Sequence, residues 1–418
     1  MFVSFFADAN AWVSLLLSNH LTGLIVKSQF SSQIPLKIKF IFLWIFCPYF
    51  FNLSASNAAG TKKGQQIMQK LAKILLIMIL TTHGAFAKDL SWQNLNDQTV
   101  KLYLQGKFTD ATQTAIKALK IAEENFDPND LNIAKSLNNL ALLYKTQGKL
   151  DLAKPLYTRA LSIREKSQGL SHPDLVAILN NLAELEKAQC KYTDAESLYN
   201  RALAIRQKSL NQNDPKIALS LNNLAGLYLA QNQYDKAEPL YQQALEIYQK
   251  SLDPNNPALA QTLNNLATLY QTQGCFDKAE PLYNRAIDIS QKNLGNGHPA
   301  TASFMNNLAA LYEKQGKYSQ AQNIFEQVLK IRKKNLSSDN PDIAQSLNNL
   351  ASVYQKSGNL KQAEKFYTDA LTVLEKTFDS NDTHLLIILQ NMAQCCKKNG
   401  NIQKAEKLQL RIKQIKSS

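Results

Sequence analysis

The sequence predicts an all-α protein in which about eight antiparallel helix pairs stack into one array. An asparagine pair, followed by a hydrophobic residue and alanine, returns at a fixed interval of 42 residues. The pairs are Asn138-Asn139, Asn180-Asn181, Asn222-Asn223, Asn264-Asn265, Asn306-Asn307 and Asn348-Asn349, with Gln390-Asn391 as the seventh. Such a constant spacing indicates one helical unit repeated many times. In a globular domain, insertions in the loops would have broken the exact period. Glycine is scarce, at 14 residues, and most glycines of the array recur at one position, so few irregular connections are expected.

Residues 68–87 precede the array and read MQKLAKILLIMILTTHGAFA. Lysines before an apolar run, with small residues at Ala85 and Ala87, are typical of a cleaved signal peptide. The apolar run is far shorter than the ~20 residues that a membrane span needs. We therefore expect cleavage after Ala87, a periplasmic or secreted protein, and no stable membrane insertion afterwards. If the signal is not used, we expect a cytoplasmic protein.

Residues 1–67 contain an aromatic-rich apolar run from Phe40 to Phe51 but no clean helical or alternating period. Export signals work at an N-terminus, so our hypothesis is that translation starts at Met68 and that residues 1–67 belong to an over-extended gene model. The alternative is a genuine leader, disordered or associated with a membrane. Mass spectrometry of the native N-terminus distinguishes the two.

The predicted array covers residues 88–418, and each repeat holds a first helix and a second helix joined by a tight turn. The repeats are expected near residues 90–128, 130–170, 172–212, 214–254, 256–296, 298–338, 340–380 and 382–416. The first and last repeats diverge, which is expected because terminal repeats must face water.

The first helix of the 130–170 repeat is predicted to begin at the N-cap Asp130. In later repeats a proline opens this helix, where its missing N–H has no partner to lose. These prolines are Pro173, Pro215, Pro257, Pro299 and Pro341. Leu137, Leu140, Ala141 and Tyr144 follow the spacing of a buried stripe. Glycine ends most first helices, as a left-handed C-cap favours, and Cys190 and Asn232 stand there in two repeats.

The second helix is predicted to bury Ala153, Leu156, Tyr157, Ala160 and Leu161. In two repeats it is expected to start at a capping box. The boxes pair Asp235 with Glu238 and Asp277 with Glu280. Basic residues late in the second helix are expected to complement the helix dipole. These are Arg164, Arg206 and Arg332.

Residues 264–287, NNLATLYQTQGCFDKAEPLYNRAI, show the repeat best. This string resembles the tetratricopeptide repeat, in a bacterial form of the 42-residue subtype found in kinesin light chains. The resemblance extends over nearly all of residues 90–418. It implies a right-handed superhelix whose first helices line a concave groove that holds peptide ligands.

On a helical wheel, Lys135, Asn139, Leu142 and Thr146 lie opposite the buried stripe, so the second asparagine of each pair is expected to face the groove. Its amide matches the C=O and N–H of an extended peptide, and the resemblance implies this role. The candidate peptide-binding residues are Lys135, Asn139, Asn181, Asn223, Asn265, Asn307, Asn349 and Asn391. The alternative is that the amides tie neighbouring helices together, which is the reading favoured for the first asparagine.

A basic residue four positions before the second asparagine is expected in relatives that bind acidic peptides, and here only Lys135 provides one. The other repeats have Ala177, Leu219, Gln261, Ser303, Gln345 and Ile387 there. A more neutral ligand is therefore expected.

The net charge is +14, of which residues 1–87 contribute +6, so the array is only mildly basic and mixed in sign. This distribution disfavours nucleic acid as a partner, since a binding surface would show a concentrated basic stripe. No cysteine and histidine spacing indicates a metal site, and no catalytic set or cofactor motif converges. We therefore expect a protein that is not an enzyme and has no cofactor.

Three functions remain. The first is a scaffold that binds a peptide segment or a partner protein in the concave groove. The second is a secreted effector that engages a host protein. The third is an accessory subunit that organises an enzyme or cell-envelope complex through its convex side. The sequence does not predict the ligand or the oligomeric state.

Overall fold

The computed structural model describes residues 91–417. These residues form sixteen α-helices and, in this range, no β-strand. The helices follow one another in packed pairs, which confirms the predicted all-α fold class. Residues 1–67 and the predicted signal peptide at 68–87 lie outside the described residues. The chain divides into two compact units between Ser167 and Gln168, and each is described by itself.

The first unit contains a helix over residues 91–104 and the helices α5 (Phe108–Asn125), α6 (Leu131–Thr146) and α7 (Leu150–Gln168). Helix α5 packs against α6. Trp92 Nε1 donates a hydrogen bond of 2.7 Å to Ser136 Oγ, and the Trp92 ring meets Phe126 edge to face. These contacts fix the helix over 91–104 against the following repeat.

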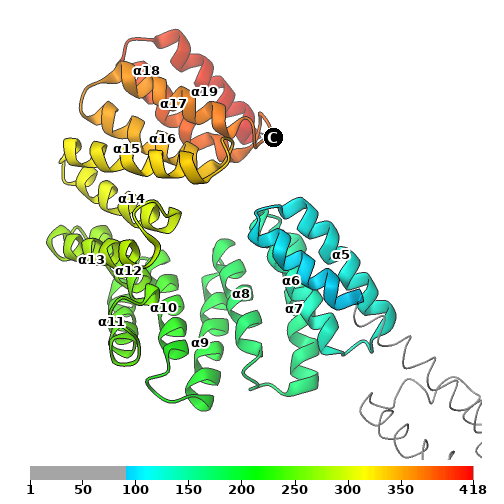
Figure 1. The fold of residues 1–418 in the computed structure, drawn as a ribbon. Helices are drawn as coiled ribbons and strands as arrows, with labels where there is room; N and C mark the ends of the chain where they lie inside the picture. Colours follow the sequence, from blue (N-terminus) through cyan, green and yellow to red (C-terminus); the bar gives the residue numbers. More distant parts are fainter. Residues whose placement is uncertain (1–90, 418) are drawn as a thin grey trace, which may run out of the picture. The chain divides into compact units, whose positions relative to one another are not determined.

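The second unit contains the helices from α8 to α19 (Figure 1). They are α8 (Leu175–Ala188), α9 (Tyr192–Ser209), α10 (Pro215–Ala230), α11 (Tyr234–Ser251), α12 (Pro257–Thr272), α13 (Phe276–Leu294), α14 (Pro299–Lys314), α15 (Tyr318–Asn335), α16 (Pro341–Lys356), α17 (Leu360–Leu374), the 3₁₀ helix η2 (Thr383–Leu385), α18 (Leu386–Lys398) and α19 (Ile402–Ser417). Even-numbered helices are the first helices of their repeats. From α10 to α18 each first helix also contacts the next first helix, so the first helices form one continuous layer.

The predicted helix starts are confirmed at four of the five prolines, which open α10, α12, α14 and α16. Pro173 is the exception, because α8 begins two residues later at Leu175. Asp130 caps α6 through a hydrogen bond of 2.7 Å from the backbone N–H of Asn132. His298 caps α14 in the same way, as a residue preceding proline at a helix start can.

The first helices end in left-handed residues, as the recurring glycine predicts. Gly316, for example, has a φ of 76°. Cys190 and Asn232 adopt the same conformation, each with a φ of 58°, although an L side chain is strained there. The fold therefore imposes this turn even where the sequence does not favour it.

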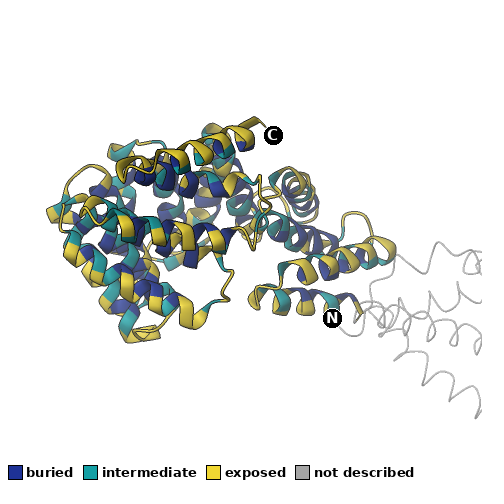
Figure 2. Ribbon diagram, turned by 90° about the horizontal axis from the view of Figure 1, so that it is seen from above, coloured by how far each residue is buried: buried dark blue, intermediate teal, exposed yellow. Residues whose placement is uncertain are grey.

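Most residues of the predicted stripes are buried, whereas Tyr144 and Leu156 are half-buried. Small residues in the stripes allow close approach of neighbouring helices. Ala141 and Ala153 are fully buried, and so is the second-helix residue Tyr157. Figure 2 shows buried residues along the helix faces that meet one another, and exposed residues on the outward faces and loops. Cys395 and Cys396 are both buried.

The predicted capping boxes are wrong. Helix α11 begins at Tyr234, so Asp235 already lies inside the helix and makes no capping bond. Glu238 instead accepts a hydrogen bond of 2.7 Å from the Tyr270 hydroxyl, 32 residues further on. Glu280 accepts the equivalent bond of 2.8 Å from Tyr312. These glutamates stabilise contacts between repeats rather than helix starts.

Arg206 and Arg332 lie in the last turn of their helices, as the predicted helix-dipole role requires, and each also bonds the following repeat. The Arg332 guanidinium is buried and donates to the Asp342 carbonyl and Ser346 Oγ, both over 2.8 Å, at the start of the next first helix. Arg206 bonds Ser220 Oγ over 2.8 Å in the same manner. Burial lowers the pKa of Arg332 because desolvation disfavours its charge.

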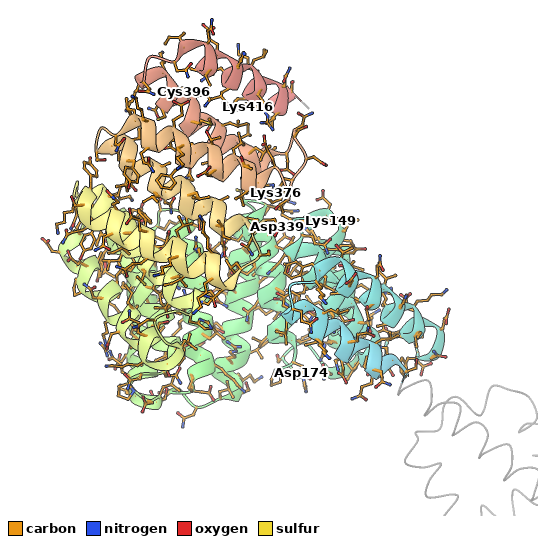
Figure 3. All side chains as sticks on the ribbon, turned by 45° about the horizontal axis from the view of Figure 1, so that its top comes forward. Lys149, Asp174, Asp339, Lys376, Cys396 and Lys416 are labelled. Carbon is orange, nitrogen blue, oxygen red and sulfur yellow. The ribbon has the colours of Figure 1, made fainter. Side chains whose placement is uncertain are left out.

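Loops of successive repeats are joined by side chains that reach backbone carbonyls. Thr377 Oγ1 donates a hydrogen bond of 2.6 Å to the Asp339 carbonyl. Asn335 Nδ2 donates one of 2.9 Å to the Gly297 carbonyl. Figure 3 shows the labelled residues Asp339 and Lys376 on two of these neighbouring loops. These hydrogen bonds connect the loops between repeats to one another along the second unit.

Candidate functional site

The asparagine pairs form hydrogen bonds between neighbouring repeats, which we call the asparagine ladder. In each bond Nδ2 of a second asparagine donates to Oδ1 of the first asparagine 43 residues earlier. In the second unit the bonds run from Asn265 to Asn222 (3.3 Å), from Asn307 to Asn264 (2.9 Å), from Asn349 to Asn306 (2.9 Å) and from Asn391 to Asn348 (3.0 Å). The first asparagines therefore serve as acceptors between helices.

The first unit contains one bond of the same kind, in which Asn139 Nδ2 donates to Asn96 Oδ1 over 3.1 Å. Lys135, one turn before Asn139, is exposed, and its Nζ lies over the Trp92 ring, 5.3 Å from the centroid. These two predicted site residues therefore share one face of α6, and Lys135 covers the Trp92 indole of the helix over 91–104.

The ladder does not use up the hydrogen-bonding capacity of the second asparagines. An asparagine amide has two N–H donors and an oxygen with two acceptor sites, and each ladder bond uses one N–H. All seven predicted asparagines are half-buried, so part of each side chain reaches solvent. The residue one turn before them is exposed in every repeat. A row of amides thus reaches solvent along the first helices of the second unit, and Asn139 presents one such amide in the first unit.

One junction of the ladder in the second unit is open. Asn180 Oδ1, on α8, is enclosed and has no hydrogen-bond partner among the described residues. Asn223, which stands 43 residues later on α10, makes no side-chain hydrogen bond within residues 91–417. Neither N–H donor of Asn223 is therefore bound to a described residue.

The second-helix tyrosines point their hydroxyls at the neighbouring first helix, where most of them find a partner. The Tyr283 hydroxyl donates to Gln271 Oε1 over 2.6 Å and lies 3.0 Å from Thr268 Oγ1. Tyr367 donates to Gln355 Oε1 over 3.1 Å. Burial raises the pKa of Tyr283 to about 12 because it disfavours the phenolate.

Tyr241 differs from these tyrosines. Its side chain is 1% exposed, and no described residue hydrogen-bonds its hydroxyl. The positions that hold Thr268 and Gln271 in the next repeat are occupied here by Gly226 and Leu229, which offer no polar side chain. A Cβ placed on Gly226 would meet only the Tyr241 hydroxyl, at 3.5 Å. Sequence reasoning missed this position, although Gly226 is a helix-interior glycine where neighbouring repeats carry side chains.

A second surface feature lies on the second helices. An open depression of about 390 Å³ is formed by residues of α17 and α19. Its lining residues are Lys361, Glu364, Lys365, Thr368, Asp369 and Lys404. Lys404 Nζ bonds Glu364 Oε1 over 2.7 Å, and this bond lowers the pKa of Glu364. The opposed charges neutralise each other, so the depression has no strong charge of one sign.

The described residues contain no group of three or more histidine, cysteine or acidic side chains that could hold a metal ion. Within 91–417, no helix has the length and apolar character that crossing a membrane requires. The described histidines have local roles at helix starts. His384, for instance, lies beside Asp382, whose Oδ1 accepts from the His384 backbone N–H over 2.8 Å.

Stacked helix pairs with an inter-repeat ladder define a tandem helical-repeat protein. The tetratricopeptide repeat family model matches residues 102–166, 174–250, 258–334 and 342–416. A second tetratricopeptide repeat model matches residues 138–209 and 306–377. The chain belongs to the tetratricopeptide repeat family, as its sequence predicts.

Solved structures are similar to parts of the chain. BtubC (BKLC) from P. vanneervenii is 28% identical over 55% of this chain and 92% of its own, with a TM-score of 0.48. A putative kinesin light chain from Podosopora anserina is 27% identical over 49% of this chain and 97% of its own, with a TM-score of 0.44. The apo quorum sensor NprR from B. thuringiensis shares the fold at 15% identity, over 87% of this chain and 97% of its own, with a TM-score of 0.59. No curated protein sequence matches the chain.

Proposed function

We propose that the protein is a non-enzymatic scaffold that binds an extended peptide segment of a partner protein along the first helices of its repeats. The observation that carries this proposal is the row of half-buried second asparagines, in which Asn307, Asn349 and Asn391 each use only one N–H in the ladder. Extended peptides present C=O and N–H groups along their length, which side-chain amides can bond regardless of sequence. Tetratricopeptide arrays commonly serve as interaction scaffolds, since stacked repeats create extended binding surfaces.

The exposed residues one turn before the second asparagines in the second unit carry no charge. Leu219 and Ile387 are among them, with exposed fractions of 42% and 66%. This composition supports a ligand without a strong net charge. We also propose that the protein acts after export, on the basis of the signal-peptide pattern at residues 68–87.

The test separates loss of the binding amides from loss of the ladder bonds. The double variant Asn265→Ala/Asn307→Ala removes two second asparagines and two ladder bonds. The control Asn222→Ala/Asn264→Ala removes the same two bonds but keeps both second asparagines. The probe is a phage-displayed library of random twelve-residue peptides, selected on the full chain.

The wild type and the control should enrich the same peptides, whereas the Asn265→Ala/Asn307→Ala variant should lose them with its helical circular dichroism unchanged. Equal enrichment by all three proteins would place binding elsewhere on the molecule. In that case, the depression lined by α17 and α19 is the next surface to alter.

A further inference from the structure

Three features of the second unit meet at α10 and have no structural explanation so far. Among the described residues the Asn223 amide lacks its ladder partner and the Tyr241 hydroxyl has no hydrogen-bond partner, and Gly226 carries no side chain that could supply one. Asn223 and Gly226 are three residues apart on one helix, so they are neighbours on the same face.

The next repeat shows what the empty position can hold. There Thr268 occupies the place of Gly226, and its Oγ1 lies 3.0 Å from the Tyr283 hydroxyl and donates to the Asn264 carbonyl over 2.9 Å. A hydroxyl suits this place because it donates and accepts at once. At Gly226 the protein supplies the tyrosine and the carbonyl but not the hydroxyl between them.

A structural role does not account for glycine at this position. Gly226 has no left-handed φ, and an added Cβ meets the Tyr241 hydroxyl at an ordinary contact distance. Glycine inside a helix is also less favourable than alanine. Glycine at this position therefore weakens the helix and leaves the hydroxyl of an almost fully buried tyrosine without a partner among the described residues, and a ligand hydroxyl can supply that partner.

We propose that Gly226, Tyr241 and Asn223 form an anchoring subsite for a serine or threonine of the bound peptide. The ligand hydroxyl takes the place that Thr268 Oγ1 occupies one repeat later and bonds the Tyr241 hydroxyl. Asn223 bonds the backbone amide of the same ligand residue with the donors that the ladder leaves unused. Glycine at 226 lets the ligand backbone approach the helix closely.

This inference rests on the proposed function, and it adds the residue class that fixes the register of the peptide. The amides elsewhere along the row bond a peptide at any register, because its backbone repeats. A single pocket that requires a hydroxyl selects one register, since a buried donor or acceptor left unpaired is costly.

The test variant is Gly226→Thr, which supplies the hydroxyl from the protein itself. Threonine is at least as favourable as glycine in a helix, so the thermal unfolding midpoint should stay the same or rise. The matched control is Ala310→Thr, which adds the same side chain at the equivalent position of α14. In that repeat the second helix has Phe325 in place of the tyrosine, so no hydroxyl awaits a partner.

The probe is the same library of random twelve-residue peptides on phage, selected on the full chain. Peptides enriched by the wild type should share a serine or threonine at one position. The best of them should bind Gly226→Thr about tenfold more weakly, as expected for one or two lost hydrogen bonds, and Ala310→Thr within about twofold of the wild type. When the shared serine or threonine of that peptide is replaced by alanine, its affinity for the wild type should fall. The affinity of the Tyr241→Phe variant for the peptide should not change with this replacement, because the variant has no hydroxyl to bond.

Two outcomes would overturn the subsite. Enriched peptides without a shared hydroxyl residue, or peptides that bind Gly226→Thr as well as the wild type, would refute it. If such peptides still depend on Asn265 and Asn307, the proposed function stands without the subsite. If the wild type enriches no peptide, the proposed function fails and the subsite fails with it.

Discussion

Replacing Asn307 by alanine should destabilise the second unit, whereas the same replacement of Asn223 should not. Asn307 Nδ2 donates to Asn264 Oδ1, and Asn264 is only 6% exposed. Removing the donor leaves a buried acceptor unpaired, which costs about 1–3 kcal/mol. Alanine returns up to ~0.7 kcal/mol through its higher helix propensity. With the full propensity gain, the net loss for Asn307→Ala is about 0.3–2.3 kcal/mol.

Asn223→Ala breaks no hydrogen bond with a described residue, so only the propensity gain of up to ~0.7 kcal/mol applies. Propensity cancels when the two variants are compared, and the difference of about 1–3 kcal/mol measures the ladder bond. Asn264→Ala should fall between them, because the half-buried Asn307 amide that it leaves behind can bond water.

The assay is urea unfolding at 25 °C followed by helical circular dichroism on the full chain. Wild type, Asn223→Ala, Asn264→Ala and Asn307→Ala are compared at equal concentration, and the midpoints are read together with the slopes. Equal destabilisation by Asn223→Ala and Asn307→Ala would refute the reasoning, since it would mean that the ladder is continuous through α8 and α10.

Three further outcomes are expected. Cys190→Gly should stabilise the fold by about 1 kcal/mol, because it relieves a left-handed L residue; a lower thermal midpoint would contradict this. Iodoacetamide at pH 8 should label the exposed Cys190 and Cys275 in the native protein. The buried Cys395 and Cys396 should react only after unfolding, and burial also raises the pKa of Cys396 to about 11. Peptide mass spectrometry identifies the labelled cysteines. Burial raises the pKa of Tyr283 from 10.0 to about 12, so the stability of the wild type relative to Tyr283→Phe should be constant below pH 10 and fall as the pH rises toward about 12; a pH-independent difference in urea midpoints would show that the phenol is not buried.

Most of the fold could be predicted because the same sequence patterns recur in every repeat. Apolar periodicity placed the buried stripes, and proline and glycine marked the starts and ends of the first helices. The glutamates of the second helices were misassigned because a capping box is a local pattern, whereas the partner of Glu238 is a tyrosine 32 residues away. The position of Arg332 in the last turn of its helix was predicted, but its hydrogen bonds to the next repeat were not, since they also join residues far apart in the sequence.

The candidate site could be predicted only in part. The helical wheel indicated that the second asparagines share one face and that the first asparagines approach a neighbouring helix. The open junction between Asn180 and Asn223 has no sequence signal, because the residues there are the same as at the junctions that are bonded. The missing side chain at Gly226 could have been found in the sequence. Aligning the repeats places Gly226 where the next repeat has Thr268, and Tyr241 where it has Tyr283.

The spacing of the ladder also restricts how such a gene can change length. Excising residues 256–297, one full period, would bring Asn307 opposite Asn222. Asn307 could then form the ladder bond that Asn265 makes to Asn222 in the intact chain. Losing one residue inside a helix would turn the part of that helix that follows by ~100° about its axis and present the wrong side chain at the junction. Descendants of this chain are therefore expected to gain or lose whole periods.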